Sequence, residues 1–387
     1  MQEKEIVFPD YNHCILNTIN SILKYYQVET KYNGLSELDE ILKKGYKNIV
    51  FVILDGMGEY VLKDVSPQGF FKKNEKAVIT SVFPSTTTAA LSVYYSGRPP
   101  IETGWVAMSQ YFKEYGRAIE MLRKIDSYTK EPIKNVRSDV FEKVDYEKIY
   151  DKIEKANPDV RAYEINPGFC EARSKRNINA DNLDIFCDSI ESICKNTEKN
   201  FILAYQDNPD SVLHHFGCKA EQVKDYVLEA EEKINKMCEN LKGTDTLVIV
   251  TADHGHRDIL KIYNVLEIEE IQDCLIMPPS LESRSVAFWV KEDKKEKFEK
   301  YFEENLKEDF LLYTKEEILS KKLLGEGEKH PKIDDFIGNY IAIAIGDAIL
   351  KIETYIGKEK KDKKATHCGL TPNEMYVPVI TIDCCEK

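Results

Sequence analysis

The chain is short of basic residues relative to acidic ones. It has 54 lysines and arginines against 67 aspartates and glutamates, which gives its 387 residues a formal net charge of −13. An acidic surface repels polyanions, so we exclude a nucleic acid polymer or an anionic membrane as the main partner. A small anionic substrate is compatible with this charge, because bound metal ions can reverse the sign of the field locally.

Long apolar runs and paired cysteines are also missing. The best apolar run, IVFVIL before Asp55, is as long as a strand and far shorter than the roughly 20 residues that span a membrane. The first residues, MQEKEIVFPD, lack the basic start and apolar core of a secretory signal. The ten cysteines include no Cys-x-x-Cys pair, and Cys384 adjoins Cys385, an awkward arrangement for a mutual disulfide. We therefore expect a cytoplasmic protein with free thiols and no membrane partner, and we leave its oligomeric state open.

The chain alternates short apolar runs with amphipathic segments. The expected strands are 48–54, 201–205 and 246–250, and the expected helices are 88–95, 181–195 and 221–241. Two further strand-like stretches, 340–345 and 376–382, are expected to return to the same sheet. This alternation predicts an α/β fold with a mostly parallel sheet and helices on both of its faces.

The composition changes after Arg257. Residues 285–290 have the pattern of a strand, and residues 291–306 have the pattern of a highly charged helix. We therefore predict a catalytic core and a smaller inserted α+β subdomain that carries substrate contacts. The core would comprise residues 1–258 and 337–387, and the insert residues 259–336.

Acidic and histidine residues follow three of the expected strands. They are Asp55 after the first strand, Asp210 and His214 after the second, and Asp253 and His254 after the third. In an open α/β sheet, ligands bind beyond the carboxyl ends of the strands. We therefore expect residues that are far apart in the sequence to meet there.

The spacing of Asp210 and His214 is a separate, local indication of a metal site. Asn208 and Pro209 suit the start of a helix, so residues four apart would lie on one face of it. A carboxylate and an imidazole presented together are suitable ligands for zinc. The alternative is a helix-start aspartate beside an unrelated surface histidine. His256 either lies next to such ligands or faces solvent.

Three threonines begin the expected helix in VFPSTTTAALSVYYSG, residues 82–97. The free N–H groups at a helix start favour developing negative charge. A threonine hydroxyl is a poor nucleophile until a base or a metal ion lowers its pKa. Threonine at this position is usually a helix cap, and only the neighbouring ligand candidates favour a catalytic role.

Five motifs carry a resemblance to a known family. They occur in the order found in the alkaline phosphatase superfamily, and they resemble its type I phosphodiesterase/nucleotide pyrophosphatase branch. The motifs are ILDGMG at 53–58, FPSTTTAALSVYYSG at 83–97, PDSVLHHFG at 209–217, TADHG at 251–255 and THCG at 366–369. The resemblance covers roughly residues 48–258 and the last forty, and it implies an alkaline phosphatase-like core.

The resemblance also implies a two-metal site. One zinc ion would be held by Asp55, Asp253, His254 and the nucleophile, and the other by Asp210, His214 and His367. Matching the family pattern from Pro84 to Gly97 places the nucleophile at Thr87, with Thr86 and Thr88 as fallbacks. Two zinc ions suit these ligands, and manganese is the competing metal.

The implied function is hydrolysis of a small phosphorylated substrate. A phosphodiester or pyrophosphate bond, in a substrate of nucleotide type, would be cleaved through a covalent phospho-threonine. His367 lies far beyond His254 with the predicted insert between them, which resembles the phosphodiesterase branch more than the mutases. The alternatives are a phosphomonoesterase or metal-dependent phosphomutase on the same core, and a non-catalytic metal-binding relative.

Substrate recognition is less determined by the sequence. Relatives that cleave nucleotides carry an asparagine shortly after the nucleophile helix, where this chain reads TGWVAMSQY with Met108 near the expected position. Either Gln110 replaces that donor, or metal ions and backbone N–H groups stabilise the oxyanion alone. We expect specificity to come from the insert and from residues 104–180. His330, Arg284 and His256 are the candidate substrate contacts. The alternatives are a solvated hinge loop for His330 and a structural ion pair for Arg284.

Overall fold

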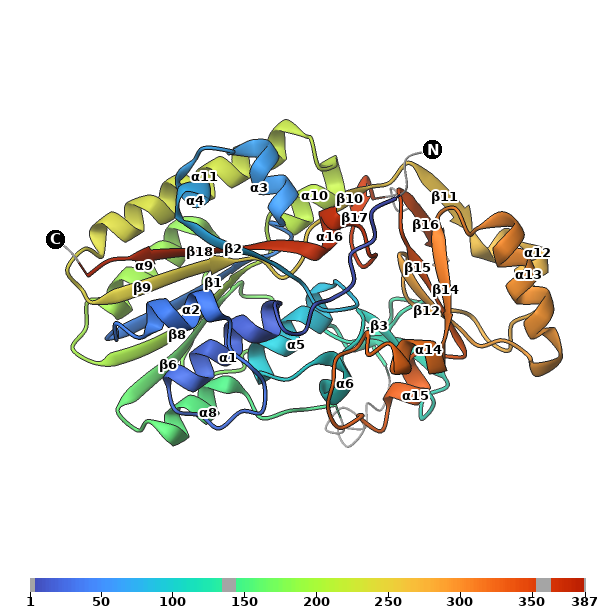
Figure 1. Ribbon diagram of the computed structural model, residues 1–387, viewed down its shortest axis with the longest axis horizontal. Coiled ribbons are helices and arrows are strands. Elements are labelled where there is room, and N and C mark those ends of the chain that lie inside the picture. The colour runs from blue at the N-terminus through green and yellow to red at the C-terminus, as the bar shows by residue number, and fades with distance from the viewer. Residues whose placement is uncertain (1–3, 134–143, 353–362, 386–387) are drawn as a thin grey trace.

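The computed structural model describes residues 4–133, 144–352 and 363–385, and its centre is a mostly parallel sheet (Figure 1). Within these residues the strand order is β2-β18-β9-β1-β8-β6-β7, with only β18 antiparallel to its neighbours. The strands are β1 (Asn48–Leu54), β2 (Glu75–Thr80), β6 (Val160–Asn166), β7 (Asn177–Asn179), β8 (Lys199–Gln206), β9 (Thr246–Thr251) and β18 (Tyr376–Asp383). The expected strands 48–54, 201–205, 246–250 and 376–382 therefore join one sheet, together with β2, β6 and β7, which the sequence analysis did not predict.

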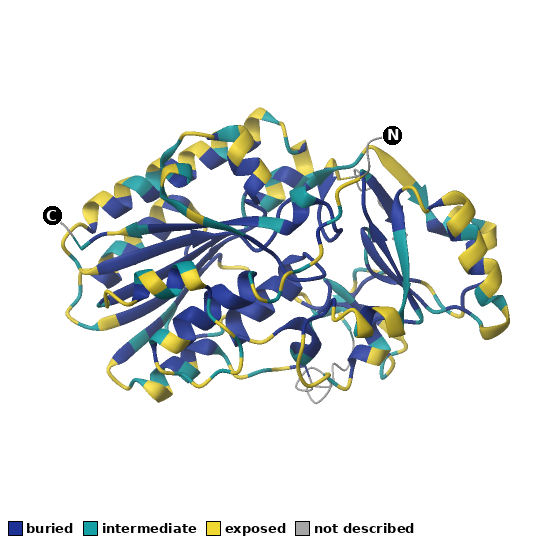
Figure 2. Cartoon of the chain, viewed as in Figure 1, coloured by how far each residue is buried: buried dark blue, intermediate teal, exposed yellow. Residues whose placement is uncertain are grey.

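Helices cover both faces of this sheet (Figure 1). One face carries α1 (Ile15–Tyr25), α2 (Ser36–Leu42), α5 (Thr87–Ser96) and α8 (Ile149–Ala156). The other carries α3 (Glu59–Val65), α4 (Phe70–Asn74), α9 (Leu183–Cys194), α10 (Asp210–Phe216) and α11 (Glu221–Asn240). Every residue of β1 is buried, as a strand covered on both faces must be (Figure 2). The predicted fold class is confirmed.

A second, antiparallel sheet of order β12-β13-β15-β14 lies beside the core (Figure 1). Its strands are β12 (Ser280–Glu282), β13 (Ser285–Phe288), β14 (Phe310–Thr314) and β15 (Tyr340–Ala344), and α12 (Glu269–Gln272) and α13 (Lys295–Asn305) accompany it. The prediction that 340–345 returns to the main sheet was wrong, because β15 pairs with β13 and β14. The prediction for 376–382 was right, since β18 lies between β2 and β9.

The boundaries of the inserted part stay a proposal. β11 (Lys261–Asn264) pairs with β16 (Ala348–Lys351), so the chain is still in the second part well after residue 336. β10 (Arg257–Asp258) pairs with β17 (Ala365–Thr366), which brings the two ends of the insertion together. We propose that the insert extends to about residue 352 rather than ending at 336.

Short elements complete the described chain. A small antiparallel sheet is formed by β3 (Ser109–Phe112), β4 (Arg117–Glu120) and β5 (Ile125–Asp126). The remaining helices are α6 (Pro100–Thr103), α14 (Lys315–Ser320), α15 (Ile333–Phe336) and α16 (Pro372–Met375), with 3₁₀ turns at Val265–Glu267 and Glu292–Lys294. Among the described residues, no helix combines the length and apolarity needed to cross a membrane. All ten cysteines are free thiols.

Candidate active site

The carboxyl ends of three neighbouring strands form the site. Leu54, the last residue of β1, lies opposite Gln206 of β8, and Ile53 lies opposite Thr251 of β9. The chain segments that leave these strands are therefore adjacent. The N–H of Asp210 donates to the carbonyl oxygen of Asp55 at 2.9 Å. Helix α10 begins at Asp210, one residue later than the sequence suggested.

One group of candidate ligands lies at the ends of β1 and β9. The ligand atoms of Asp55, Asp253 and His254 lie within 4.8 Å of one another. His254 Nε2 is 3.5 Å from Asp55 Oδ1 and 3.3 Å from Asp253 Oδ2. The N–H groups of Gly56 and His254 donate to Asp253 Oδ1, which leaves Oδ2 facing the group. This arrangement presents two carboxylates and one imidazole to one point.

A second group surrounds Asp210. Its Oδ1 lies 2.6 Å from His256 Nε2, 3.4 Å from His214 Nε2 and 3.6 Å from His367 Nε2. His254 also belongs to this group, so the two groups share a member. Of the two alternatives that the sequence left open for His256, the structure selects the position next to the ligands. The only signal for this position was the second histidine of the run Asp-His-Gly-His.

The histidine rings are oriented by backbone carbonyl groups. The Nδ1 atoms of His214, His254 and His367 lie 2.8, 3.1 and 3.1 Å from the carbonyl oxygens of Ala365, Gly255 and Ser85. A carbonyl oxygen can only accept, so each Nδ1 carries the proton and each Nε2 offers a lone pair. His256 differs, since its Nε2 faces Asp210 and its Nδ1 has no partner among the described residues.

The pKa values of two buried aspartates indicate that the site lacks compensating positive charge among the described residues. Burial and the charges of Asp253 and Asp210 raise the pKa of Asp55 well above its usual value. Burial also raises the pKa of Asp253, although His254 opposes this. Asp55 Oδ1 and Asp253 Oδ2 are buried with no hydrogen-bond partner among the described residues. Converging carboxylate oxygens without donors, beside imidazole lone pairs, fit a divalent metal ion.

The pKa values of Asp210 and His214 are shifted as well. Burial opposes its ionisation, but His214 and His256 lower the pKa of Asp210 well below its usual value. Burial lowers the pKa of His214 to about 3, so this imidazole is neutral and can act as a ligand. Lys363 Nζ lies 3.0 Å from His214 Nε2, which places a cation next to the lone pair.

Only one of the three threonines faces the ligand groups. Thr87 Oγ1 lies 3.2 Å from His254 Nε2 and 3.4 Å from Asp55 Oδ2, at the first residue of α5. The hydroxyl of Thr86 instead donates to Glu282 at 2.5 Å. The hydroxyl of Thr88 is buried with no partner among the described residues.

A cavity of about 880 Å³ opens onto Thr87, Asp55 and Asp210. Met108 lines it, as its position after the nucleophile helix suggested. Gln110 does not, because its Oε1 accepts the N–H groups of Val106 and Ala107 and its Nε2 donates to Gly104. The idea that Gln110 replaces the expected asparagine was wrong, since its amide is fully used inside its own loop.

Arg284 is not placed to contact a substrate. Its side chain has no exposed surface, and its Nε and Nη2 each donate to the carboxylate of Glu374 at 2.6 Å. The other donors reach the carbonyl oxygens of Ala348 and Gly346. The sequence-based expectation for Arg284 is therefore corrected to a structural ion pair.

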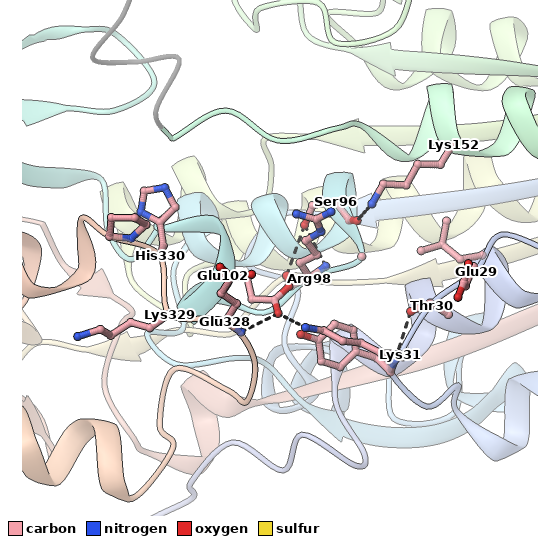
Figure 3. A pocket seen from close by; sticks show the side chains of 14 residues that line it. Glu29, Thr30, Lys31, Ser96, Arg98, Glu102, Lys152, Glu328, Lys329 and His330 are labelled. Carbon is pink, nitrogen blue, oxygen red and sulfur yellow. Dashed lines mark hydrogen bonds and ion pairs between the residues drawn. The ribbon is translucent and has the colours of Figure 1, made fainter.

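His330 lies in a different cavity, of about 540 Å³ (Figure 3). Its neighbours there include Glu102, Arg98 and Lys152, and it does not line the cavity of Thr87. Lys152 Nζ donates to the carbonyl oxygen of Ser96 at 2.7 Å, and burial together with Arg98 lowers the Lys152 pKa to about 8. The expectation that His330 reaches the substrate is not supported by this placement.

The comparisons with known proteins can now be set beside this geometry. Residues 49–349 match the family model described as type I phosphodiesterase / nucleotide pyrophosphatase. The chain belongs to this family. The resemblance carried by the five motifs is thereby confirmed, and the protein is a hydrolase of the phosphodiesterase/nucleotide pyrophosphatase type.

Solved structures share the fold at low identity. Murine ectonucleotide pyrophosphatase/phosphodiesterase 5 is 16% identical with a TM-score of 0.60, and the match covers 86% of this chain and 87% of that one. The human protein of the same name is 15% identical with a TM-score of 0.61 and the same coverage. Phosphonoacetate hydrolase from Sinorhizobium meliloti 1021 is 14% identical with a TM-score of 0.57, over 86% and 89% of the chains. No curated protein sequence matches the chain significantly.

Proposed function

We propose that this family member is a two-metal phosphodiesterase or nucleotide pyrophosphatase with Thr87 as its nucleophile. The observation that carries the proposal is the position of the Thr87 hydroxyl at the start of α5, 3.2 Å from His254 and 3.4 Å from Asp55. It lines the cavity beside carboxylate oxygens that lack partners. An inactive variant of the murine relative is described in complex with AMP, which supports a small phosphorylated substrate for this chain too.

The metal ligands are proposed from the same geometry. Asp55, Asp253 and His254, whose ligand atoms lie within 4.8 Å of one another, would hold one ion together with Thr87. Asp210, His214 and His367 would hold the other, since the Nε2 atoms of His214 and His367 lie 3.4 and 3.6 Å from Asp210 Oδ1. Bound ions would polarise the phosphoryl oxygens and lower the pKa of the threonine hydroxyl and of water. Zinc suits this mixture of imidazole and carboxylate ligands, and manganese is the alternative. The expected cytoplasmic location stays a prediction.

The chain itself supplies the nucleophile and its orientation. Thr87 Oγ1 would form a bond to phosphorus while the bond to the leaving oxygen breaks, and water would later break the phospho-threonine bond. The free N–H groups of the first turn of α5 point toward the charge that develops there. Met108 offers no hydrogen bond to the phosphoryl oxygens, so metal and backbone would have to stabilise them.

Replacing the nucleophile tests the proposal. Thr87→Ala in zinc-loaded protein should slow cleavage of bis(p-nitrophenyl) phosphate at least about a thousandfold. Thr88→Ala is the matched control, because its hydroxyl is buried and has no described partner, and it should stay within a few fold of the wild type. A Thr87→Ala protein that binds metal, folds and keeps full turnover would overturn the assignment.

The second candidate is a phosphomonoesterase or phosphomutase on the same site. Met108 favours it, since the donor expected in nucleotide-cleaving relatives is missing from this cavity wall. p-Nitrophenyl phosphate measured beside the diester separates the two. Faster monoester cleavage would select the second candidate, and isomerisation of a sugar phosphate would identify a mutase.

A further inference from the structure

Helix α5 runs along the wall of the catalytic cavity. Thr87, Leu91 and Tyr95 all line the cavity, and residues four apart lie on one helical face. The eight residue-to-residue steps from Thr87 to Tyr95 span about 12 Å along the helix axis. The cavity therefore continues for more than two helical turns beyond the nucleophile.

An arginine, Arg173, lies beside Tyr95, about two helical turns from Thr87. Arg173 also lines the cavity, and its guanidinium carbon lies 4.4 Å from the ring centre of Tyr95. This contact places a positive charge on the cavity wall about two turns of α5 from Thr87. Arginine stays protonated at any working pH, so the charge is permanent.

The hydrogen-bonding capacity of Arg173 is largely unused. Among the described residues its guanidinium donates one bond, from Nη1 to the carbonyl oxygen of Glu171 at 3.1 Å. The Oε1 atom of Glu164 lies 3.6 Å from Nη1 and forms a buried ion pair with it, while Oε2 accepts the N–H groups of Arg173 and Ser174. The side chain of Arg173 is 16% exposed, and this ion pair helps to hold it on the cavity wall.

The wall between the two ends is mainly apolar. Leu91, Trp105, Met108 and Met121 line it, and the indole N–H of Trp105 is already donated to Val144 at 2.6 Å. Two lysines also line the cavity, and both form ion pairs, Lys124 with Glu171 and Lys148 with Asp145. The cavity is thus lined by Thr87 and the ligand candidates, by apolar side chains and by the guanidinium group of Arg173.

We propose that Arg173 binds a second anionic group of the substrate, a carboxylate or a phosphate, about 12 Å from the phosphorus that Thr87 attacks. The substrate class is a phosphodiester or pyrophosphate whose apolar or aromatic body carries a further negative charge. This inference rests on the proposed function and adds the class of substrate to it.

Matched synthetic diesters test the inference. p-Nitrophenyl alkyl phosphates ending in a carboxylate are compared with the same esters ending in a primary amide. About ten bonds bridge 12 Å, since an extended chain gains about 1.2 Å per bond. At that length the carboxylate ester should have a kcat/KM about tenfold or more above that of the amide, and shorter esters should lose the preference.

Variants assign the preference to the guanidinium. Arg173→Met should abolish it mainly through a higher KM, and Arg173→Lys should keep part of it because the charge remains. Arg161→Met, at an arginine that is about one-third exposed and pairs with Glu198, is the matched control and should keep it in full. Turnover of bis(p-nitrophenyl) phosphate, which lacks a second anion, should be unchanged in Arg161→Met, and the melting temperature of each variant shows whether it is folded.

The outcomes separate this inference from the proposed function. A carboxylate preference that is absent in the wild type, or unchanged in Arg173→Met, overturns the role of Arg173 while diester cleavage stands. An equal loss of both ester types in Arg173→Met makes the residue structural and also overturns it. Lack of cleavage of any diester by the wild type would instead count against the proposed function.

Discussion

At the scale of single residues, four histidines lie close to the carboxylate of Asp210. His214 and His256 both face Asp210, at 3.4 and 2.6 Å. They differ in what holds them. The Nδ1 of His214 is fixed by the carbonyl oxygen of Ala365, and its Nε2 contacts Lys363 Nζ at 3.0 Å, a contact that a metal ion would have to replace, whereas the Nε2 of His256 bonds Asp210 itself. We infer that His214 is a ligand and that His256 positions the carboxylate.

The metal content of two variants checks this distinction. His214→Asn should lose about one of the two metal ions per chain, because a ligand is removed. His256→Asn should keep both ions and lose about 10- to 100-fold in affinity, because only an orienting hydrogen bond is lost. Elemental analysis after dialysis measures the first, and a metal titration the second. A full metal complement in His214→Asn with a deficit in His256→Asn would reverse the two roles.

At the scale of elements, a buried ion pair joins the second sheet to the ligand loop. Arg284 lies between β12 and β13, and Glu374 lies in α16, after the strand β17 that leads to His367. Glu374 also accepts the N–H of Gly369 at 2.7 Å and the hydroxyl of Thr371 at 2.6 Å. The pair therefore fixes the loop that carries His367 against the inserted part.

Breaking this pair should be costly. Arg284→Met leaves the Glu374 carboxylate buried without its cation, and we expect the free energy of unfolding to fall by about 3–5 kcal/mol. Arg257→Met is the control. Its ion pair with Asp347 is about one-third exposed, so its loss should cost at most about 1 kcal/mol. Urea denaturation measures both, and equal, small losses would show that the buried pair does not hold the loop.

At the scale of the whole molecule, the site collects residues from distant parts of the chain. Asp55, Asp210 and Asp253 follow β1, β8 and β9, and His367 comes from beyond the inserted part. Without metal, burial and the neighbouring carboxylates of Asp253 and Asp210 raise the pKa of Asp55. Bound metal ions would therefore tie the carboxyl ends of the central strands to the returning segment.

Removing metal should weaken the whole fold. A ligand present at about a thousand times its Kd stabilises the native state by about 4 kcal/mol, so chelation should lower the melting temperature and stop diester cleavage together. Zinc should restore both, and manganese tests the alternative metal. Calorimetry on protein shown by elemental analysis to be metal-free is the measurement. An unchanged melting temperature would mean that the site is preformed and contributes little to stability.

The sequence by itself determined four strands of the main sheet, β1, β8, β9 and β18, and the order of the candidate ligands. Apolar runs such as 48–54 are long enough and continuous enough to form buried strands, and polar residues at their ends reach the same edge of a parallel sheet. These are local signals, so one segment at a time suffices to recognise them. The five motifs added the family for the same reason.

Only the tertiary structure decided which side chain meets which. The stretch 340–345 has the same apolar pattern whether it pairs in the main sheet or in the second one, and its partners, β13 and β14, are chosen by the packing of the insert. Arg284 and His330 were candidate substrate contacts in the sequence. The fold buries Arg284 against Glu374 and places His330 in another cavity. Among three adjacent threonines, the direction in which each one leaves α5 selected Thr87. Side-chain direction depends on residues that are distant in the sequence, and no local pattern contains them.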